Sequence, residues 1–580
     1  MNRTQKIAGA LMTVLSGAAV YCFFALRYPY HLHFQEQYQL FEFTWGYFAS
    51  VAGVPGGLAD WAGRFLTQFC YYAPAGAAVT ALVFCALQLL TWAACRQRTL
   101  PVYALSFLPS AILLVFLCDE HSLLGGPVAL ILALAASVLC RRVSSARVRR
   151  VTEAVLVPAL YMACGPLVVV FVLVRILDEG GRGGRIAALA AVLLATAALC
   201  PPVAARLFPY PLGRLYLGVH YYRYHNILPG LLWISALGVV VTVLVSLSKG
   251  RILSGTLRGV LVFACVAGAG TFFTLRTADP VKEEWMRYDF MVRMQMWNRI
   301  MMAADRRNPD NPKTVSCLNL ALSKTGRMPD HQFEYFQNGP EGLLPEFVGD
   351  CTNPVSTGEI YWHLGMVNTA QRFAFEAQEA IPDFQKSARF YQRLAQTNIV
   401  NGDTDVARKY LKALTHTAFY RKWARETLSL LDAGTVFEQR PELARARDLR
   451  LREHDFFFSG TEMDSMLGLL KVENPSNTMA LDYLMAWCLL RKDLDRFVEC
   501  IGLVEAPVMP KAYQEALLLR WVLTHSSFEG LPAYLSPDNA LRINNFIVDM
   551  QAKRPEEEMR RKYGDTYWFY YYYRYRSSAQ

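Results

Sequence analysis

The residues most able to do chemistry in this 580-residue chain are the acidic side chains of its N-terminal half. Residues 1–275 contain only eight Asp and Glu, and five of these lie in two loops between apolar runs: Glu36, Glu42, Asp60, Asp119 and Glu120. A carboxylate beside lipid is costly unless it is hydrated, ion-paired or bound to a metal. These two loops are therefore where we expect acid–base chemistry or metal binding.

The two acidic loops differ in character. Residues 31–48 of the first loop interleave aromatic residues and Leu with amides and acids, a pattern typical of an interfacial helix with one wet face. The second loop is only residues 118–122, which places Asp119, Glu120 and His121 together where an apolar run ends. Solvated loop ends are the alternative interpretation of both loops.

A third polar stretch mixes basic and aromatic side chains. Residues 206–226 include several Tyr together with five basic side chains: Arg206, Arg214, His220, Arg223 and His225. Tyr anchors a chain at the headgroup level of a membrane, and Arg binds phosphate through two parallel N–H donors. The stretch is therefore either a site for an isoprenoid phosphate or an ordinary aromatic and basic belt at the membrane interface.

The elements that position these residues are apolar runs on the order of 20 residues, long enough to cross about 30 Å of hydrocarbon. We place them at 6–26, 73–95, 101–117, 123–140, 151–177, 183–200, 228–247 and 255–275. The first is predicted to be a retained anchor, because no small-residue cleavage site follows it. The first half is thus a polytopic transmembrane domain, 1–275, with about eight hydrophobic segments.

Charge predicts the orientation of these segments. The first 275 residues hold 20 Lys and Arg against 8 Asp and Glu, whereas the remainder holds 39 against 40. The basic residues near 3–6, 96–98 and 141–150 fall on one side, which the positive-inside rule assigns to the cytoplasm. The acidic loops 27–72 and 118–122 are then external. Since the second half is nearly neutral and has no basic stripe, no nucleic-acid partner is expected.

One of the eight runs is predicted not to span the membrane as a single helix. In a simple eight-span arrangement Lys249, Arg251 and Arg258 would lie outside, against the positive-inside rule. Pro158 and the Gly165–Pro166 pair interrupt the run 151–177, and such residues kink or split helices. With this run broken, the number of crossings becomes odd and the C-terminal half is periplasmic.

Residues 276–580 are predicted to form a soluble helical-repeat domain, which makes the fold class all-α throughout. Residues 393–414 resemble a tetratricopeptide repeat, with Gly402 at the turn and the small Ala395 and Ala407 where two helices approach. Single repeats cannot bury their apolar faces, so neighbours must stack into an α-solenoid with a concave surface for a protein or glycan partner. The tail 567–575 is aromatic, and docking on its own domain is the favoured interpretation.

The two external acidic loops resemble the layout of the GT-C class of membrane glycosyltransferases. The resemblance implies a polyprenyl-phosphate-linked sugar donor, with Glu36 as the candidate catalytic base and Glu42 as a less favoured one. It assigns Asp119 and Glu120 to a metal or to the donor, although in the class one residue separates such a pair. No cofactor motif is present, and Mg²⁺ or Mn²⁺ is the cofactor that this resemblance implies, since both prefer oxygen ligands.

The chain as a whole resembles an uncharacterised family of multispanning Bacteroidota membrane proteins with a C-terminal helical-repeat domain. This resemblance implies a location in the bacterial inner membrane and supplies no activity. It rests on residues 35–41, 55–58, 319–322, 401–403 and 563–570.

Two functions of different classes remain open. The first is a GT-C-like glycosyltransferase at the outer face of the inner membrane. The second is a non-catalytic, membrane-anchored scaffold whose solenoid recruits partners for envelope assembly or secretion. A transporter ranks third, because the near absence of charge within the apolar runs argues against ion coupling.

Overall fold

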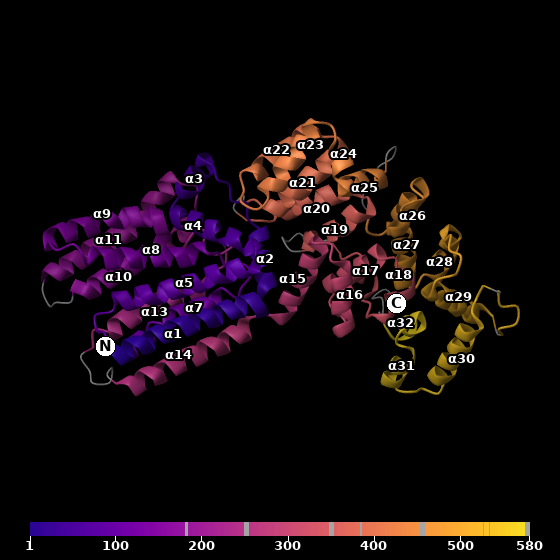
Figure 1. The fold of residues 1–580 in the computed structure, drawn as a ribbon, viewed down its shortest axis with the longest axis horizontal. Helices are drawn as coiled ribbons and strands as arrows, with labels where there is room; N and C mark the ends of the chain where they lie inside the picture. Colours follow the sequence, from indigo (N-terminus) through magenta and orange to yellow (C-terminus); the bar gives the residue numbers. More distant parts are fainter. Residues whose placement is uncertain are drawn as a thin grey trace. The chain divides into compact units, whose positions relative to one another are not determined.

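The computed structural model describes residues 1–179, 184–224, 226–248, 255–346, 353–382, 385–451, 459–525, 527–532 and 534–574. Within these residues the chain is all-α, and the only extended pairing is an isolated bridge between Ser122 and Tyr222. Two compact units are present (Figure 1). Unit 1 comprises 1–283, 381–389 and 413–423, and unit 2 comprises 284–380, 390–412 and 424–580. Two short segments of the C-terminal half, 381–389 and 413–423, thus belong to unit 1.

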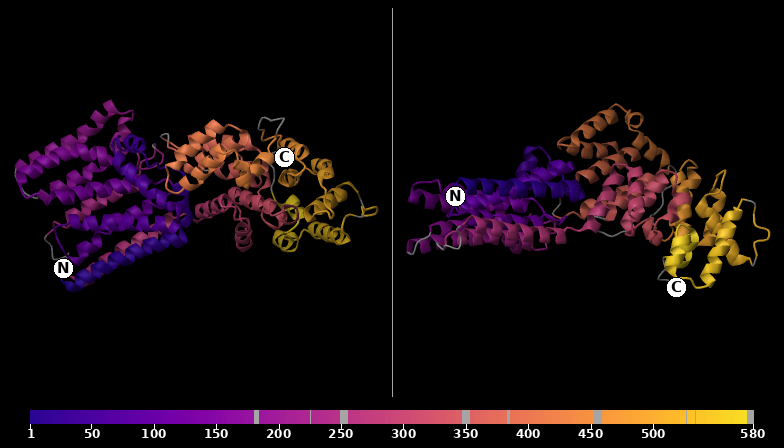
Figure 2. Two further views of the ribbon diagram at one scale, coloured as in Figure 1. Left: turned by 45° about the horizontal axis from the view of Figure 1, so that its top comes forward. Right: turned by 60° about the horizontal axis from the view of Figure 1, so that its bottom comes forward.

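Unit 1 is a bundle of apolar helices that run side by side (Figure 2). Among the described residues, most of each predicted apolar run is helical, and the run 101–117 is divided between two helices. Five helical stretches are long and apolar enough to cross a membrane, namely Arg3–Arg27, Ala73–Ala94, Arg147–Glu179, Ala190–Leu207 and Thr256–Thr277. The helices are α1 (Arg3–Cys22), α2 (Pro29–Gln37), α3 (Trp45–Ala52), α4 (Gly57–Thr67), α5 (Ala73–Ala94), α6 (Leu100–Leu105), α7 (Leu108–Phe116), α8 (Gly125–Cys140), α9 (Ala146–Cys164), α10 (Val168–Glu179), α11 (Gly184–Leu207), α12 (Leu212–Leu217), α13 (Gly230–Val245) and α14 (Thr256–Thr277).

The predicted break in the run 151–177 is present, at Gly165. This glycine has a φ of +62° and ends α9, and a short 3₁₀ turn then leads into α10. Side chains on either side of the turn meet: Arg175 Nε lies 2.7 Å from Glu153 Oε1, and Arg149 lies 2.7 Å from Glu179 Oε1. Helices α9 and α10 therefore fold back on each other as a hairpin, and this stretch does not cross the bundle as one rod. Pro158 lies inside α9 and does not break it.

The bundle has two distinct ends. At the end we call the basic end, the N-terminal ammonium donates to the Arg98 carbonyl (2.9 Å), and Arg96 N–H donates to Ser246 Oγ (3.1 Å). At the opposite end, the polar end, the Tyr28 hydroxyl donates to the Cys118 carbonyl (3.3 Å) and accepts from Asp279 N–H (3.3 Å). Helix α14 begins at the basic end and finishes at the polar end, so the chain leaves unit 1 at the end opposite to its N-terminus. Lys249 and Arg251 lie outside the described residues.

Unit 2 is built from helices, and helices that are neighbours in the chain pack against each other in pairs. Neighbouring helices α19 and α20, and likewise α26 and α27, pack against each other. The helices are α15 (Pro280–Arg293), which begins in unit 1, α16 (Trp297–Arg306), α17 (Pro312–Lys324), α18 (Met328–His331), α19 (Asn353–Leu364), α20 (Val367–Glu379), α21 (Ala388–Asn401), α22 (Thr404–Thr415), α23 (Arg421–Asp432), α24 (Val436–Gln439), α25 (Pro441–Leu449), α26 (Met463–Glu473), α27 (Thr478–Leu490), α28 (Leu494–Cys500), α29 (Lys511–Thr524), α30 (Pro537–Gln551), α31 (Glu556–Tyr563) and α32 (Tyr567–Tyr573).

The best-defined predicted turn is confirmed in detail. Helices α21 and α22 meet at Gly402, which has a φ of +91°, and Ala395 and Ala407 are fully buried. A residue with a Cβ would be strained at that backbone angle, which explains the glycine.

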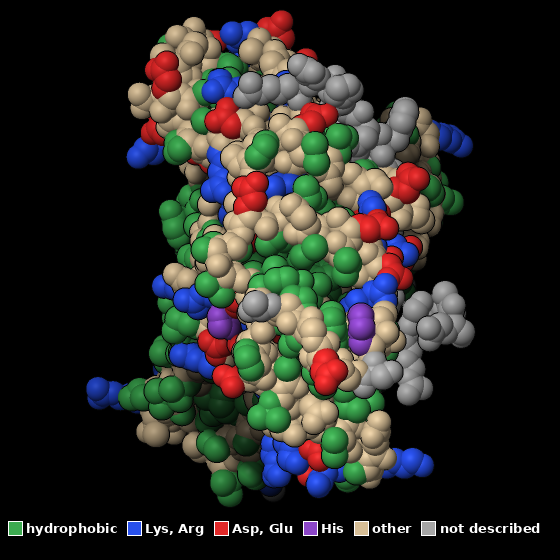
Figure 3. All heavy atoms as spheres, turned by 90° about the vertical axis from the view of Figure 1, so that its right-hand side faces the viewer, with side chains coloured by type: hydrophobic (Ala, Val, Ile, Leu, Met, Phe, Trp, Pro, Cys, Tyr) green, Lys and Arg blue, Asp and Glu red, His purple; other side chains and the backbone are tan. Residues whose placement is uncertain are grey.

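Acidic and basic side chains are interspersed with hydrophobic ones on the face drawn in Figure 3, as the near-neutral composition of residues 276–580 predicts.

The aromatic tail docks on its own unit. Helix α32 has its first four residues buried, and the Trp568 indole N–H donates to the Glu515 carbonyl (2.7 Å). The Glu515 carboxylate accepts Tyr567 N–H (2.7 Å) and so caps the start of the helix, while burial raises its pKa to about 7. The Tyr570 hydroxyl donates to the Leu490 carbonyl (2.6 Å). Packing inside the unit therefore accounts for the aromatic residues through Tyr570.

Candidate functional site

Helix α2 forms the centre of the polar end, and it is not the interfacial helix that the sequence predicted. Six of its nine residues are buried, including His31, Gln35, Glu36 and Gln37. The prediction of one wet face was wrong because other segments of unit 1 cover the helix. One is the second acidic loop, since the Gln35 amide donates to the carbonyl and to the hydroxyl of Ser122 (3.3 Å each).

The second acidic loop is fixed by pairing with the residues that follow α12. Besides the bridge between Ser122 and Tyr222, Arg223 N–H donates to the His121 carbonyl (2.9 Å). The half-buried Asp119 carboxylate accepts two hydrogen bonds at 2.8 Å, from the Tyr222 hydroxyl and from His121 N–H. Both of its oxygens are thus engaged within unit 1.

Glu120, the second predicted metal ligand, is buried and ion-paired. Its Oε1 accepts from Lys282 Nζ at 2.6 Å. Burial alone would raise the pKa of Glu120, but the hydrogen bond from the Lys282 ammonium holds it below the usual value. No group of three or more His, Cys, Asp or Glu placed to hold a metal occurs among the described residues. Two adjacent carboxylates that already have partners do not fit Mg²⁺ or Mn²⁺, which take more oxygen ligands.

The start of α2 is capped by an acid from another helix. The two oxygens of Glu283, in the first turn of α15, accept Tyr30 N–H (2.8 Å) and His31 N–H (2.9 Å). These backbone donors have no partner within α2, so the carboxylate supplies a cap in trans. Burial raises the pKa of Glu283 to about 8, although the two N–H groups oppose the shift. The capped His31 is fully buried, and burial lowers its pKa to about 4.

Glu36, the predicted base, is held by a residue of the C-terminal half that belongs to unit 1. Its carboxylate is 4% exposed and accepts from the Tyr420 hydroxyl (3.2 Å). The segment 413–423 is anchored by the stacking of Phe419 on Tyr71, with ring centroids 5.0 Å apart. Glu36 and Tyr420 line a small pocket together with Gln39, Gln68 and Thr417.

The segment 381–389 packs on the same helix. Arg389 donates to the Gln37 side-chain oxygen (2.7 Å), Ser387 Oγ donates to the Gln37 carbonyl, and Ala388 N–H donates to the Gln39 carbonyl (3.2 Å). The last turn of α2 is therefore enclosed by two segments that lie hundreds of residues away in sequence.

Glu42, the less favoured base, lies apart from these contacts at the edge of the polar end. It is half-buried, and burial raises its pKa, while His416 and Lys386 oppose that shift. The neighbouring Phe43 N–H donates to the His416 carbonyl (2.8 Å). Glu42 thus faces the same two segments as Glu36.

The described residues of the predicted lipid-phosphate site are Arg206, Arg214, His220 and Arg223. Arg206 is exposed near the end of α11. Arg214 lies over the Tyr210 ring (5.5 Å), and His220 Nε2 lies 3.5 Å from the Tyr210 hydroxyl. His225 lies outside the described residues. Arg223 reaches the first acidic loop, with its guanidinium 4.8 Å from the centre of the Tyr38 ring.

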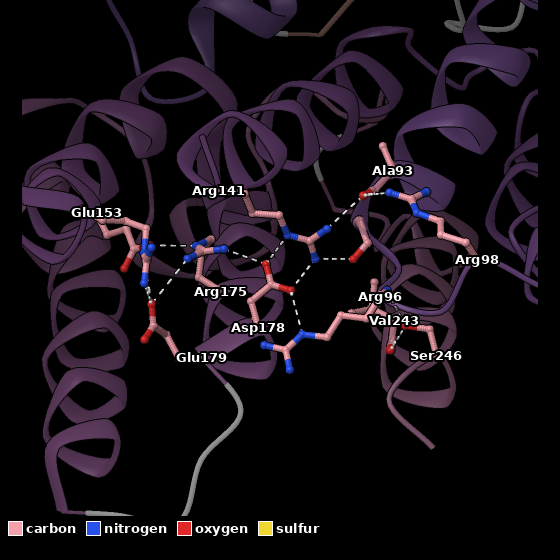
Figure 4. A network of polar contacts seen from close by, with 12 residues as sticks. Ala93, Arg96, Arg98, Arg141, Glu153, Arg175, Asp178, Glu179, Val243 and Ser246 are labelled. Carbon is pink, nitrogen blue, oxygen red and sulfur yellow. Dashed lines mark hydrogen bonds and ion pairs between the residues drawn. The ribbon is translucent and has the colours of Figure 1, made fainter. Parts of the chain in front are cut away.

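The basic end holds a charged network that sequence reasoning missed (Figure 4). Arg175 of α10 donates to Glu153 of α9 (2.7 Å) and to Asp178 (2.6 Å), and Arg141 at the end of α8 also pairs with Asp178. Arg175 and Glu153 are 2% and 0% exposed. The three remaining acids of the first 275 residues all lie here. A signal was present, since Glu153 and Arg175 stand at similar distances in sequence on either side of the predicted break at Gly165.

These features define an all-α protein with five helical stretches able to cross a membrane, a charged network at one end of the bundle and buried polar groups at the other. The chain belongs to a family of unknown function, DUF6057, whose model matches residues 3–574. No curated protein and no solved structure matches the chain. The family assignment covers both units but brings no activity with it.

Proposed function

We propose that the chain is a multi-pass protein of the bacterial inner membrane that transfers a sugar from a polyprenyl-phosphate donor, in the manner of the GT-C class. The observation that carries the proposal is the convergence of both acidic loops with Arg223 at the end of the bundle opposite to the basic loops. The positive-inside rule puts the basic end in the cytoplasm, so the polar end and the C-terminal half are periplasmic in this proposal.

Glu36 is the proposed catalytic base. A general base must have a fixed orientation and lie within hydrogen-bond reach of the acceptor hydroxyl. The Tyr420 hydroxyl fixes one oxygen of the Glu36 carboxylate, and the carboxylate lines a pocket. Tyr420 is accordingly a positioning residue in the proposal. No step is assigned to a metal, because the Asp119 and Glu120 donor set does not fit one.

The second candidate is the membrane-anchored scaffold. It is favoured by the hydrogen bonds that engage the carboxylates of Glu36, Asp119 and Glu120 within unit 1, since groups that stabilise the fold need no catalytic role. The helix pairs of unit 2 would then be the working surface, as a tetratricopeptide-like solenoid that binds a protein or glycan partner.

One experiment separates the two candidates. Purified full-length protein in lipid nanodiscs is supplied with polyprenyl-phosphate-linked hexoses and an oligosaccharide acceptor, and the glycan product is quantified. The transferase predicts a product that falls by at least about 10²-fold in Glu36→Gln, on the scale of a lost general base. Glu505→Gln, at an exposed glutamate of unit 2, is the matched control. No product from wild-type protein, with normal cell-envelope assembly in Glu36→Gln cells, would favour the scaffold.

Topology is tested with single cysteines and a membrane-impermeant maleimide in intact cells. Gly46, Ser144 and Gln439 are exposed and represent the polar end, the basic end and unit 2. In a variant lacking native soluble thiols, Gly46→Cys and Gln439→Cys should be labelled, and Ser144→Cys only after permeabilisation. Labelling of Ser144→Cys in intact cells would reverse the proposed orientation.

A further inference from the structure

A pocket at the polar end combines two features that attract an anion, an arginine without a carboxylate partner and the N-terminus of a helix. It lies between α2, α4 and the start of α8, and its lining includes Gln35, Tyr38, Gln39, Arg64, Gly125 and Arg223. Each of the two arginines has a different kind of partner.

Arg223 is a buried cation that no carboxylate neutralises. It is 4% exposed, and none of the described acids lies within ion-pair distance of it. Its Nε has no hydrogen-bond partner, and its main contact is the ring face of Tyr38. A buried charge is costly without a counter-charge, so this arrangement is explained if an anion binds in the pocket.

Arg64, in the same pocket, differs from Arg223 because it is paired with a carboxylate. Its Nε donates to Asp60 Oδ1 (3.0 Å), and its terminal nitrogen lies 2.8 Å from Asp60 Oδ2. The pocket therefore contains two guanidinium groups and one carboxylate, and it has a surplus of one positive charge.

The start of α8 adds a helix N-terminus to this surplus. Leu124 provides no side-chain cap for the first backbone N–H groups of the 16-residue helix, and Gly125 lines the pocket. A Cβ at Gly63 would collide with the Gly125 backbone, so the glycine on α4 allows that helix to pack closely against the start of α8. Uncapped N–H groups at a helix N-terminus favour an oxyanion.

We infer that this pocket binds the phosphate group of a lipid, held by Arg223 and the N-terminus of α8. Phosphate fits because the guanidinium fork matches two of its oxygens. A lipid is the favoured source because the apolar Leu123 and Leu124 also line the pocket, at the end of a bundle of apolar helices. The inference deepens the proposed transferase by naming the residues that hold the donor phosphate, but binding itself does not require turnover.

Binding is measured on detergent-solubilised full-length protein by native mass spectrometry. The probes are undecaprenyl phosphate, undecaprenol and inorganic phosphate. Undecaprenyl phosphate should bind at least about tenfold more tightly than undecaprenol, consistent with charge-assisted hydrogen bonds. Inorganic phosphate binding as tightly as the lipid would overturn the assignment to a lipid, and equal binding of undecaprenol would overturn the phosphate site.

Variants locate the site. Arg223→Gln should weaken binding of undecaprenyl phosphate by roughly tenfold or more, whereas Arg206→Gln, at the exposed arginine of the same stretch, should change it less than about twofold. Arg223→Lys retains the charge without the fork and serves if the Gln variant does not fold. Equal effects of Arg223→Gln and Arg206→Gln would contradict the inference. Glu36→Gln should retain lipid binding, so loss of its turnover alone would bear on the proposed reaction and not on this site.

Discussion

The two ends of unit 1 treat buried charge in opposite ways. At the basic end, Glu153, Asp178 and Glu179 each pair with at least one arginine, and Asp178 serves both Arg141 and Arg175. Every carboxylate of this network has a guanidinium partner, which joins α8, α9 and α10 (Figure 4). The charges of this network are therefore matched without a ligand.

At the polar end, the charged groups have partners of different kinds, and not every charge has a partner of opposite charge. Asp119 accepts a hydrogen bond from a tyrosine hydroxyl, Glu120 forms an ion pair with a half-exposed lysine, and Arg223 contacts an aromatic ring in place of a carboxylate. The same residue types therefore stabilise the fold where their charges match and leave capacity for a ligand where they do not. If this is right, cation removal should have unequal consequences at the two ends.

Removal of Arg175 should have the largest effect. Arg175→Met leaves the fully buried Glu153 without a cation, and breaking a buried pair from one side costs about 3–5 kcal/mol. Thermal unfolding of the purified protein in detergent should show a large fall in the midpoint. The double variant Glu153→Met with Arg175→Met should recover much of it, since both charges are then gone. A single variant as stable as the wild type would mean that the network is not cohesive.

Glu283 should make stability depend on pH. Its pKa of about 8 in the folded state exceeds the value of 4.5 expected when unfolded, so the folded protein retains a proton that the unfolded chain releases. The free energy of unfolding should therefore fall as pH rises between 4.5 and 8, by at most about 1.4 kcal/mol per pH unit. Glu283→Gln should flatten the profile in that range. Glu515→Gln, at the equivalent cap in unit 2, is the comparison, and a profile unchanged by Glu283→Gln would refute the role.

Local sequence patterns predicted the helices and the break well. Apolar runs of sufficient length have no stable form in lipid other than helix, and Gly165 followed by Pro166 cannot continue one. These are properties of a few consecutive residues, which is why they were visible without the fold.

The site was only partly predictable, because its composition is set by contacts between distant residues. Nothing near Glu36 indicates that Tyr420 will reach it, and nothing in the stretch 206–226 separates the buried Arg223 from the exposed Arg206. Interleaved aromatic and polar residues suggested a wet face for α2, yet the segments that cover it come from elsewhere in the chain. Tertiary burial overrode the local pattern.

Removal of Lys282, at the polar end, should destabilise the protein less than removal of Arg175. Lys282→Met removes the ammonium from Glu120, but the lysine side chain is 51% exposed, so water screens the pair and the expected loss is about 1 kcal/mol. The pKa of Glu120 should rise, because the hydrogen bond that lowers it is gone. The midpoint of thermal unfolding at pH 7 gives the first quantity. A loss as large as that of Arg175→Met would erase the difference between the two ends.

Arg223 should have the smallest effect on stability and thereby sharpen the comparison most. Arg223→Met removes a buried charge that has no carboxylate partner, a gain that offsets the lost contact with Tyr38, so we expect a net change within about 1 kcal/mol. The thermal midpoint should stay near that of the wild type while binding of undecaprenyl phosphate is lost. Stability without binding is the behaviour of a group retained for a ligand, since the fold alone gives no reason to keep it. If Arg223→Met were instead as destabilising as Arg175→Met, the guanidinium would be part of the packing, and the polar end would be as self-sufficient as the basic end.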